Sequence, residues 1–241
     1  MTLKRLLSLT RKAIDDYHMI RANDSIAIGL SGGKDSLTML YALNEMRRFY
    51  PIPFNIHAIT VDLGFSVVEN DFHHIESFCK EIDVPFTIVS TNISQVVFDI
   101  RKETNPCSLC AKLRKGAFNS RAKELGCNKI AYAHHKDDFI ETMMLSLIYE
   151  GRFYCFSPVT YLNRADLTLI RPLMYVDEAD IIGFKKKYKL PVFHNPCPAD
   201  GYTRRQYVKE LLKKLAKDNP GCKERFFHAI ISGGIAGWSN N

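Results

Sequence analysis

Long apolar runs are missing from this chain of 241 residues. A helix that spans a membrane needs about 20 consecutive apolar residues, and no stretch of the sequence reaches that length. The N-terminal stretch Met1-Thr-Leu-Lys-Arg-Leu-Leu7 is basic and apolar, but neither a long apolar core nor a small-residue cleavage site follows it. We therefore expect no signal peptide and no membrane association, and we expect a cytoplasmic protein.

The chain also has fewer acidic than basic residues. The chain has 26 Asp and Glu against 33 Lys and Arg, which gives a formal net charge of +7. A basic surplus suggests a polyanionic partner, and nucleic acid is the commonest, although many basic proteins have none. Internal repeats and low-complexity segments are absent. This length then allows one α/β domain, or one domain with a small appendage.

A second Cys-x-x-Cys pair is absent, and the seven cysteines are an odd number. The one pair is Cys107 and Cys110. In what reads as a cytosolic enzyme, this pattern favours metal binding or redox chemistry over a disulfide framework. The cysteines that occur singly are expected mainly as buried apolar residues, with the last two less certain: Cys79, Cys127, Cys155 and Cys222.

The Walker phosphate-binding motif is missing, because Ile28 and Asp35 stand where it needs Gly and Ser or Thr. Instead the chain has Ser25-Ile-Ala-Ile-Gly-Leu-Ser-Gly-Gly-Lys-Asp-Ser36, an apolar strand pattern, two glycines and a helix start. Backbone N–H groups and the helix dipole gather at such a point and bind anions. An ordinary tight turn is the plainer alternative. We expect a phosphate site formed by Ser31, Gly32, Gly33, Lys34 and Ser36.

The rest of the chain alternates strand and helix patterns. Strands are predicted over residues 25–30, 54–61, 85–89, 129–133 and 167–170. Helices are predicted over residues 3–20, 35–48, 67–82, 107–125, 139–149, 177–188, 203–217 and 223–231. Residues 92–104 fit neither pattern clearly, and 151–163 are expected to be a long connection. This alternation predicts an α/β fold with a parallel twisted sheet and helices on both faces.

The predicted organisation has three parts. Residues 1–22 form an N-terminal helix, 23–190 an α/β domain with the Cys-x-x-Cys insertion, and 191–241 a cysteine-containing loop and basic helices. Ligands of such sheets bind outside the carboxyl ends of the strands. The loop at Ser31 lies at such an end, and so do Asp62 and Gly64.

Three interpretations of the cysteine pair compete. The motif Asn105-Pro-Cys107 recurs in part as Asn195-Pro-Cys197, in a proline-rich loop that only the fold can bring close. A structural zinc site would need a fourth ligand, for which His194 is available. A redox dithiol would need only the pair. A three-cysteine 4Fe-4S cluster would leave one iron without a protein ligand. Spacing alone favours zinc without deciding.

Four motifs together resemble the tRNA 2-thiocytidine synthetase family (TtcA type) of the PP-loop ATP pyrophosphatases, and they cover nearly the whole chain in order. They are Ser31-Gly-Gly-Lys-Asp-Ser36, Asn105-Pro-Cys-Ser-Leu-Cys-Ala-Lys-Leu-Arg-Lys-Gly116, Ala133-His-His-Lys-Asp-Asp138 and Asn195-Pro-Cys-Pro-Ala-Asp-Gly201. The family commonly has Leu-Gly-His where this chain has Tyr132-Ala-His134. Related thiolases that modify uridine carry paired zinc knuckles, which are absent here.

The resemblance implies an adenine nucleotide alpha hydrolase-like fold and an ATP-dependent sulfurtransferase. Such an enzyme adenylates the C2 carbonyl oxygen of a cytidine in the tRNA anticodon loop and replaces it with sulfur. It also implies a 4Fe-4S cluster on Cys107, Cys110 and Cys197, with Mg²⁺, ATP and tRNA. The sulfur donor would be sulfide or a cysteine desulfurase, and the enzyme a homodimer. The alternatives are 2-thiouridine formation, lysidine-type ligation, or a zinc-stabilised RNA-binding module.

Individual roles follow from this chemistry. Lys34, Asp35, Arg114 and Asp138 are the expected catalytic residues. Asp35 and Asp138 would hold Mg²⁺; of the pair Asp137 and Asp138, one is expected to cap the following helix and the other to bind metal, with Asp138 favoured for the metal. At least one of His134 and His135 is expected to face ATP. Asp62 and Gly64 would meet adenosine, although an Asp that caps a turn is the near alternative.

Two basic segments are candidates for RNA contact, with a solvated helix face as the alternative. Tyr202 would stack on an unpaired base. The basic residues are Lys112, Arg114, Lys115, Arg121 and Lys123 in the first segment, and Arg204, Arg205, Lys209, Lys213, Lys214 and Lys217 in the second.

Overall fold

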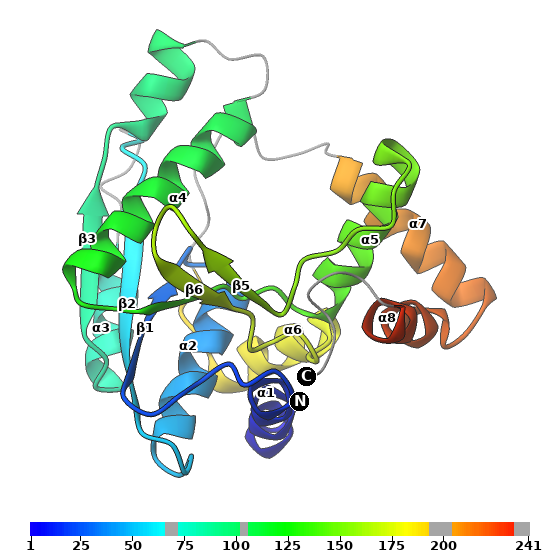
Figure 1. Cartoon of the computed structure of the whole chain (residues 1–241), viewed down its shortest axis with the longest axis horizontal. Coiled ribbons are helices and arrows are strands. Elements are labelled where there is room, and N and C mark those ends of the chain that lie inside the picture. The colour runs from blue at the N-terminus through cyan, green and yellow to red at the C-terminus, as the bar shows by residue number, and fades with distance from the viewer. Residues whose placement is uncertain (66–71, 102–105, 193–203, 234–241) are drawn as a thin grey trace.

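The computed structural model describes residues 1–65, 72–101, 106–192 and 204–233, and its centre is a six-stranded sheet (Figure 1). The strands are β1 Asp24–Gly29, β2 Phe54–Asp62, β3 Phe86–Ser90, β4 Lys129–Ala131, β5 Val159–Leu162 and β6 Leu167–Ile170. The α-helices are α1 Leu3–Asp16, α2 Lys34–Arg47, α3 His73–Glu81, α4 Pro106–Glu124, α5 Lys136–Glu150, α6 Glu178–Tyr188, α7 Arg204–Asp218 and α8 Cys222–Ser232. A short π-helix, η1, spans Gln95–Ile100.

The strand order is β3-β2-β1-β4-β6-β5. Every neighbouring pair from β3 to β6 is parallel, which confirms the predicted α/β fold. The chain moves outward from β1 to β3 and then returns to the other side of β1 with β4. Strand order therefore reverses between β1 and β4, and this switch point is where open α/β sheets bind ligands.

One edge of the sheet differs from the prediction. Residues 151–163 were expected to be a connection, but Val159–Leu162 forms β5, which pairs antiparallel with β6. The strand is four residues long and only partly buried, so it carries little of the apolar alternation that identifies a strand. The ambiguous stretch after β3 contains the π-helix, a structure that sequence periodicity does not predict.

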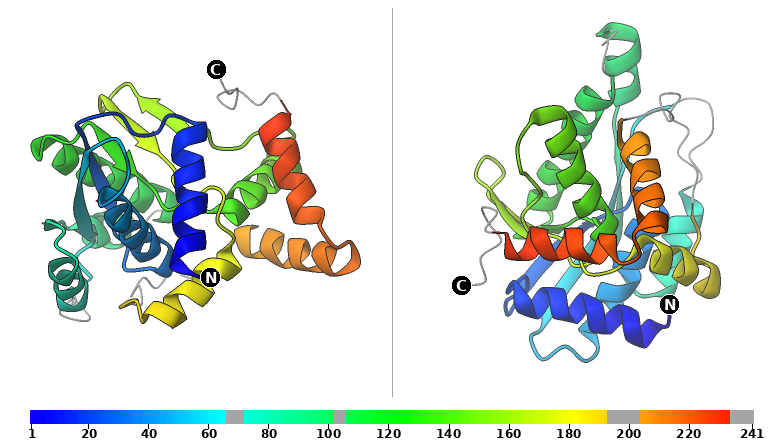
Figure 2. Two further views of the ribbon diagram at one scale, coloured as in Figure 1. Left: turned by 90° about the horizontal axis from the view of Figure 1, so that it is seen from below. Right: turned by 90° about the vertical axis from the view of Figure 1, so that its right-hand side faces the viewer.

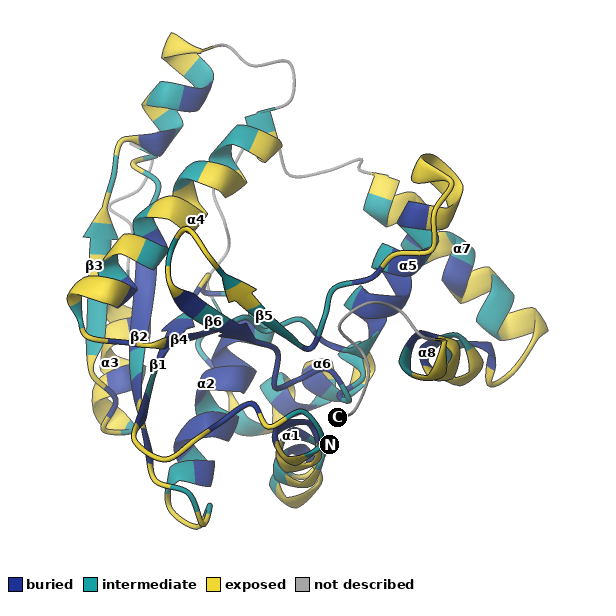
Figure 3. Ribbon diagram, viewed as in Figure 1, coloured by how far each residue is buried: buried dark blue, intermediate teal, exposed yellow. Residues whose placement is uncertain are grey.

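Helices cover both faces of the sheet, as predicted (Figure 3). Successive residues of a strand point to opposite faces, and β1 shows this clearly. Ile26 and Ile28 belong to the large core that includes residues of α1, α2 and α6, whereas Ala27 packs on the other side with Phe118 and Ala122 of α4. The helix α4 therefore lies across the sheet on the face opposite α2.

The two C-terminal helices pack on α5 (Figure 2). Val208 of α7 and Ile230 of α8 belong to the same buried core as Leu6 of α1 and Phe139 of α5. The N-terminal helix, the sheet and the C-terminal helices thus all contribute to this core. Within the described residues, no helix has both the length and the apolar character that crossing a membrane requires.

Candidate functional site

The glycine loop after β1 is held by its two serines. Ser36 Oγ donates to the carbonyl of Gly33 at 3.0 Å and accepts from the N–H of Ser31 at 3.2 Å. The two hydroxyl oxygens lie 3.3 Å apart. At the start of the loop, Thr60 of β2 donates to the carbonyl of Leu30. The loop is therefore a preformed structure, joined both to α2 and to the neighbouring strand.

The glycines give the loop its shape. Gly32 has φ of 75°, in the left-handed region where side chains are strained. Gly33 is the N-cap of α2, and it offers no side chain to the first-turn N–H groups. These N–H groups and the positive end of the helix dipole are thus left for an anion. This is the geometry expected of a phosphate site.

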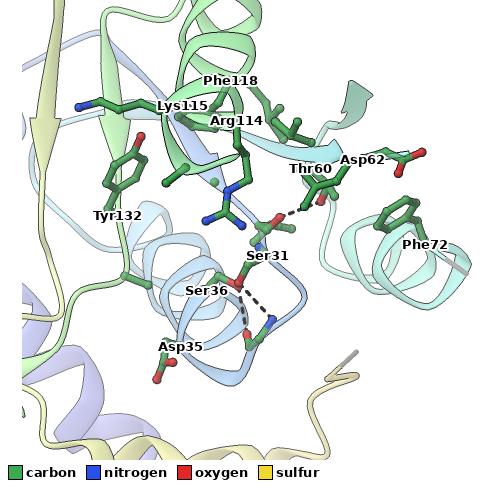
Figure 4. Close-up of a pocket in the computed structure, with 18 of the residues that line it drawn as sticks. Ser31, Asp35, Ser36, Thr60, Asp62, Phe72, Arg114, Lys115, Phe118 and Tyr132 are labelled. Atoms are coloured by element: carbon green, nitrogen blue, oxygen red, sulfur yellow. Dashed lines mark hydrogen bonds between the residues drawn. The ribbon is translucent and has the colours of Figure 1, made fainter. Parts of the chain in front are cut away.

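A cavity of about 540 Å³ opens beside this loop, at the carboxyl ends of β1, β2 and β4 (Figure 4). Ser31, Asp35 and Ser36 form one wall. Thr60 and Asp62 at the end of β2 form another, and apolar side chains such as Phe118 supply an apolar surface. A volume of this order suits a nucleotide-sized ligand. The cavity lies at the switch point of the sheet.

The helix α4 joins this cavity to the cysteine pair. Arg114 extends from α4 toward Ser31 and Ser36, whereas Lys115 extends away from them (Figure 4). Cys110 precedes Arg114 by four residues, about one turn or ~6 Å along the helix axis. Side chains at this spacing share one face. The cysteines and the cavity arginine therefore lie along one rigid element.

Lys34 is held by two carboxylates. Its Nζ lies 3.0 Å from both oxygens of Asp35 and 3.2 Å from Oε1 of Glu178 at the start of α6. Burial by itself would lower the pKa of Lys34, but the charges and hydrogen bonds of Asp35 and Glu178 outweigh it and raise the pKa above its ordinary value. Lys34 is therefore a permanent cation next to the phosphate loop.

Two predicted metal carboxylates meet at one histidine. Nε2 of His135 lies 3.7 Å from Oδ1 of Asp35 and 3.4 Å from Oδ2 of Asp138. Asp138, the residue favoured for metal, also accepts the N–H of the N-cap residue His135 at 3.0 Å and so completes the capping box of α5. Asp137 is instead buried and accepts the N–H of Glu178 and a hydrogen bond from Lys223. The capping contact thus falls on Asp138, whereas Asp137 contacts α6 and α8.

Part of the second basic segment faces inward. Nη1 of Arg205 lies 2.9 Å from Oε2 of Glu141 and 3.3 Å from Oδ1 of Asp138, and Nζ of Lys209 lies 2.6 Å from Oε2 of Glu178. These two half-exposed cations are thus already paired with carboxylates of the protein. The remaining lysines of the segment, Lys213, Lys214 and Lys217, are exposed.

His134 lines the cavity, as expected, and its ring accepts a hydrogen bond from a buried arginine. Nε of Arg171 donates to Nδ1 of His134 at 3.1 Å. Burial, together with the nearby positive charge of Arg171, lowers the pKa of His134 to about 3. His134 is therefore neutral at any physiological pH. His135, by contrast, is buried at the start of α5 and does not line the cavity.

The two residues predicted to meet adenosine have different positions. Asp62 lines the cavity, and its Oδ1 also accepts the N–H of Gly64 at 2.9 Å. Gly64 does not line the cavity. It has φ of 75°, and a Cβ there would lie 2.5 Å from the carbonyl oxygen of Thr91. Asp62 thus both lines the cavity and caps the turn that follows β2. Gly64 is needed for that turn and does not line the cavity.

The cysteines divide as the sequence suggested. Cys107 is exposed and Cys110 half-buried, at the N-terminal end of α4. Cys197 lies outside the described residues, and so do His194 and Tyr202. The four single cysteines are all buried: Cys79, Cys127, Cys155 and Cys222. In the described part of the chain, no three His, Cys, Asp or Glu side chains are arranged to hold a metal ion.

Sequence reasoning missed Glu178 and Arg171. Glu178 lies in the first turn of the helix predicted over residues 177–188, where acidic residues are common. Arg171 follows β6 directly, before Pro172. A cation at the carboxyl end of a parallel strand was the available signal, since such ends line ligand sites. Nothing in the sequence around Glu178 indicates its contact with Lys34.

Comparison with known proteins agrees with this geometry. A family model described as the PP-loop domain matches residues 4–215. The tRNA-cytidine(32) 2-sulfurtransferase of Geobacter sulfurreducens is 34% identical over 230 residues, which cover 94% of this chain and 89% of that protein. The enzyme of the same name from Pelobacter propionicus is 36% identical over 230 residues, covering 94% and 85%.

A solved structure is also similar. The U34-tRNA thiolase NcsA from Methanococcus maripaludis, determined with its 4Fe-4S cluster, has a TM-score of 0.74 and 26% identity. The match covers 92% of this chain and 76% of that one. These findings confirm the resemblance drawn from the motifs. The chain belongs to the PP-loop family and, within it, to the family of the tRNA-cytidine(32) 2-sulfurtransferases.

Proposed function

We propose that this protein is an ATP-dependent tRNA thiolase that converts a cytidine of the anticodon loop, at position 32, into 2-thiocytidine. The observation that carries the proposal is the shared helix α4, which bears Cys107, Cys110 and the cavity residue Arg114. A sulfur-handling site and an ATP site must act on one base, so they must be held at a fixed short separation.

The chemistry begins at the α-phosphorus of ATP. The C2 carbonyl oxygen of cytidine is a poor leaving group, so it first attacks the α-phosphorus and displaces pyrophosphate. A sulfur nucleophile then adds at C2, and AMP leaves with the original oxygen. Phosphoryl transfer needs alignment and charge neutralisation more than covalent help from the protein. The N–H groups of the glycine loop and the ammonium of Lys34 supply both for the pyrophosphate.

Magnesium would bind between the nucleotide and two carboxylates. Mg²⁺ takes one or two protein carboxylates and completes its shell with phosphate oxygens and water. Asp35 lines the cavity, and Asp138 lies beside the same ring nitrogen of His135.

The cysteine pair fits an iron–sulfur cluster. Cys107 and Cys110 lie one turn apart on the first turns of α4, so both thiol groups share one side of the helix. Thiolates at a helix N-terminus are stabilised by the dipole. Cys197 would be the third ligand. When bound, a cluster with three cysteine ligands supplies one iron on which an exogenous sulfur can be held.

Arg114 would orient the target base. It reaches into the cavity between the loop serines and the cysteine end of α4, which is where the activated C2 must lie. A guanidinium there can hold the base or its neighbouring phosphate by two parallel hydrogen bonds. The exposed Lys112 and Lys115 on the same helix would contact the RNA backbone. We also propose a cytoplasmic homodimer that receives sulfur from sulfide or a cysteine desulfurase.

The test uses anaerobically purified holo-protein with ATP, Mg²⁺, sulfide and an unmodified tRNA transcript. We expect released AMP and 2-thiocytidine in equal amounts, with the 2-thiocytidine measured by mass spectrometry of the digested RNA. A transcript with uridine at position 32 is the matched control and should stay unmodified. Release of ADP, thiolation at position 34, or attachment of an amine in place of sulfur would each contradict the proposal.

A further inference from the structure

Arg171 is a buried cation with unusual partners. It is 6% exposed, and it donates to Nδ1 of His134, to the carbonyl of Ser157 and to Oγ1 of Thr160. None of these acceptors carries a negative charge, and no carboxylate of the described residues forms an ion pair with it. Burying an uncompensated charge is costly. The positive field of Arg171 is thus available to an anion in the neighbouring cavity.

The contact with Arg171 fixes the proton of His134. A guanidinium carries only donors and keeps its charge in proteins. The ring atom that accepts from it, Nδ1, must therefore hold a lone pair rather than a proton. In a neutral imidazole the proton then lies on Nε2. The tautomer of His134 follows from the identity of its partner.

The ring of His134 is also held in place. Phe156 stacks on it with 4.5 Å between centroids and 18° between planes. Tyr132 meets the His134 ring edge-on, with 5.9 Å between centroids. The guanidinium of Arg171 lies over the ring of Phe156, with Cζ 5.1 Å from its centroid. With Nδ1 turned to Arg171, Nε2 is the polar edge left for the cavity that His134 lines.

The surroundings keep His134 neutral. Burial is the main cause of its lowered pKa, and the charge of Arg171 is the next. Arg205 and His135 act in the same direction from α7 and from the start of α5. Tyr132 faces the ring as an uncharged phenol, because burial raises its pKa. Burial, Arg171, Arg205 and His135 therefore all oppose protonation of His134.

We propose that Arg171 is a positioning residue that fixes His134 as a neutral Nε2–H donor to an oxygen of the α-phosphoryl group. This rests on the proposed function, which places ATP in the cavity. With pyrophosphate on the glycine loop, the α-phosphoryl group lies next to it, between the ends of β1 and β4. Negative charge on its oxygens is redistributed during transfer, and a fixed donor there lowers the barrier without needing to reorganise. Arg171 strengthens the donor by polarising the ring from behind.

The first test reads the tautomer directly. The protein is labelled with ¹⁵N-histidine, and the His134 signals are assigned by their loss in His134→Asn. We expect the neutral Nε2–H form at pH 5 through 8 in the wild type. In Arg171→Met we expect a titration whose pKa has moved up toward the ordinary value of about 6.5. Arg152→Met makes the same change at an exposed arginine and should leave the signals of His134 unaltered.

The second test reads catalysis. Removal of one fixed donor typically lowers kcat by about 10²-fold. We expect a loss of this order in RNA-dependent pyrophosphate release for Arg171→Met and His134→Asn, with little change in KM for ATP. Arg171→Lys keeps the charge and one donor, so its loss should be smaller. His134→Gln can place an amide N–H near the position of Nε2 and should retain more activity than His134→Asn.

The outcomes separate this inference from the proposed function. A proton on Nδ1 in the wild type, or a folded Arg171→Met with unchanged kcat and pH profile, would overturn the role of Arg171. If Arg171→Met does not fold, Arg171→Lys and the two His134 variants decide the question. A neutral Nε2–H tautomer in a protein that thiolates no tRNA would instead refute the proposed function, because the tautomer measurement needs no turnover.

Discussion

Lys34 and Lys209 share the carboxylate of Glu178. Nζ of Lys34 lies 3.2 Å from Oε1, and Nζ of Lys209 lies 2.6 Å from Oε2. Burial alone would raise the pKa of Glu178, but the hydrogen bond from Lys209 and the charge of Lys34 outweigh it and lower the pKa. One side chain of α6 therefore ties the phosphate loop to the C-terminal helix α7.

The loop residues give the first prediction. Lys34→Ala and Asp35→Ala should each reduce pyrophosphate release by at least about 10²-fold, because they remove charge that stabilises the transition state and its metal. Thermal unfolding should show that both variants are folded. Lys12→Ala is the control, since Lys12 pairs with Asp16 on α1, lies over the ring of Tyr175 and does not line the cavity. Full thiolation by the Lys34 variant would refute the role of the loop lysine.

The second prediction separates two lysines of α7. Lys209→Ala leaves Oε2 of the half-buried Glu178 carboxylate without its lysine partner, so the free energy of unfolding should fall by about 1–3 kcal/mol. Lys213→Ala, at an exposed position, should change it by less than about 0.5 kcal/mol. Lys213→Ala should instead reduce the slope of log affinity for tRNA against log salt by about 0.7 to 0.9, one phosphate contact. Urea denaturation and salt-dependent binding measure the two effects, and equal responses of both variants would contradict the distinction.

Iron content gives the third prediction. Anaerobic wild-type protein should be brown, with a broad absorption band in the visible range, and Cys107→Ala, Cys110→Ala and Cys197→Ala should each lose the iron. Cys79→Ala should keep it. Burial raises the pKa of Cys79 to about 12, and a thiol that stays protonated does not ligate metal. A colourless protein with stoichiometric zinc would show that the cysteines form a structural site.

The fourth prediction compares two Asp–Lys pairs. Asp24 and Lys129 lie 2.8 Å apart with side chains 5% and 8% exposed, whereas Asp166 and Lys123 lie 2.7 Å apart with side chains 70% and 45% exposed. Asp24→Asn should destabilise the protein by about 3–5 kcal/mol, because it leaves a buried lysine unpaired. Asp166→Asn should have no measurable effect, because solvent already screens that pair.

The same pair determines part of the acid sensitivity. Burial alone would raise the pKa of Asp24, but hydrogen bonds from Lys129, the N–H of Arg21 and Asn128 outweigh it and hold the pKa below its ordinary value of 3.8. The contribution of Asp24 is therefore complete above about pH 3.8 and is lost as the pH falls through the lowered pKa. In Asp24→Asn, the free energy of unfolding should therefore depend less on pH in this acidic range. An unchanged acid limb would contradict the assignment.

Local patterns predicted most of the secondary structure. The glycine loop was identified because a strand, two glycines and a helix start are contiguous, so the phosphate site needs no distant residue. The same holds for Cys107 and Cys110, which lie three positions apart in the sequence. The strand β5 was missed because it is short and half-exposed, and its pairing with β6 is decided by the hairpin rather than by apolar alternation.

The sequence by itself determined the phosphate loop, the cysteine pair and the family, since each is encoded in a short run whose local geometry follows from its own residues. Only the tertiary structure decided which charges meet. Glu178 reaches Lys34 and Arg171 reaches His134 across more than thirty residues of chain, and Arg205 and Lys209 turn inward because α7 packs on α5 and beside α6. Ion pairs of this kind form where packing places the side chains, and no periodicity in the sequence records it.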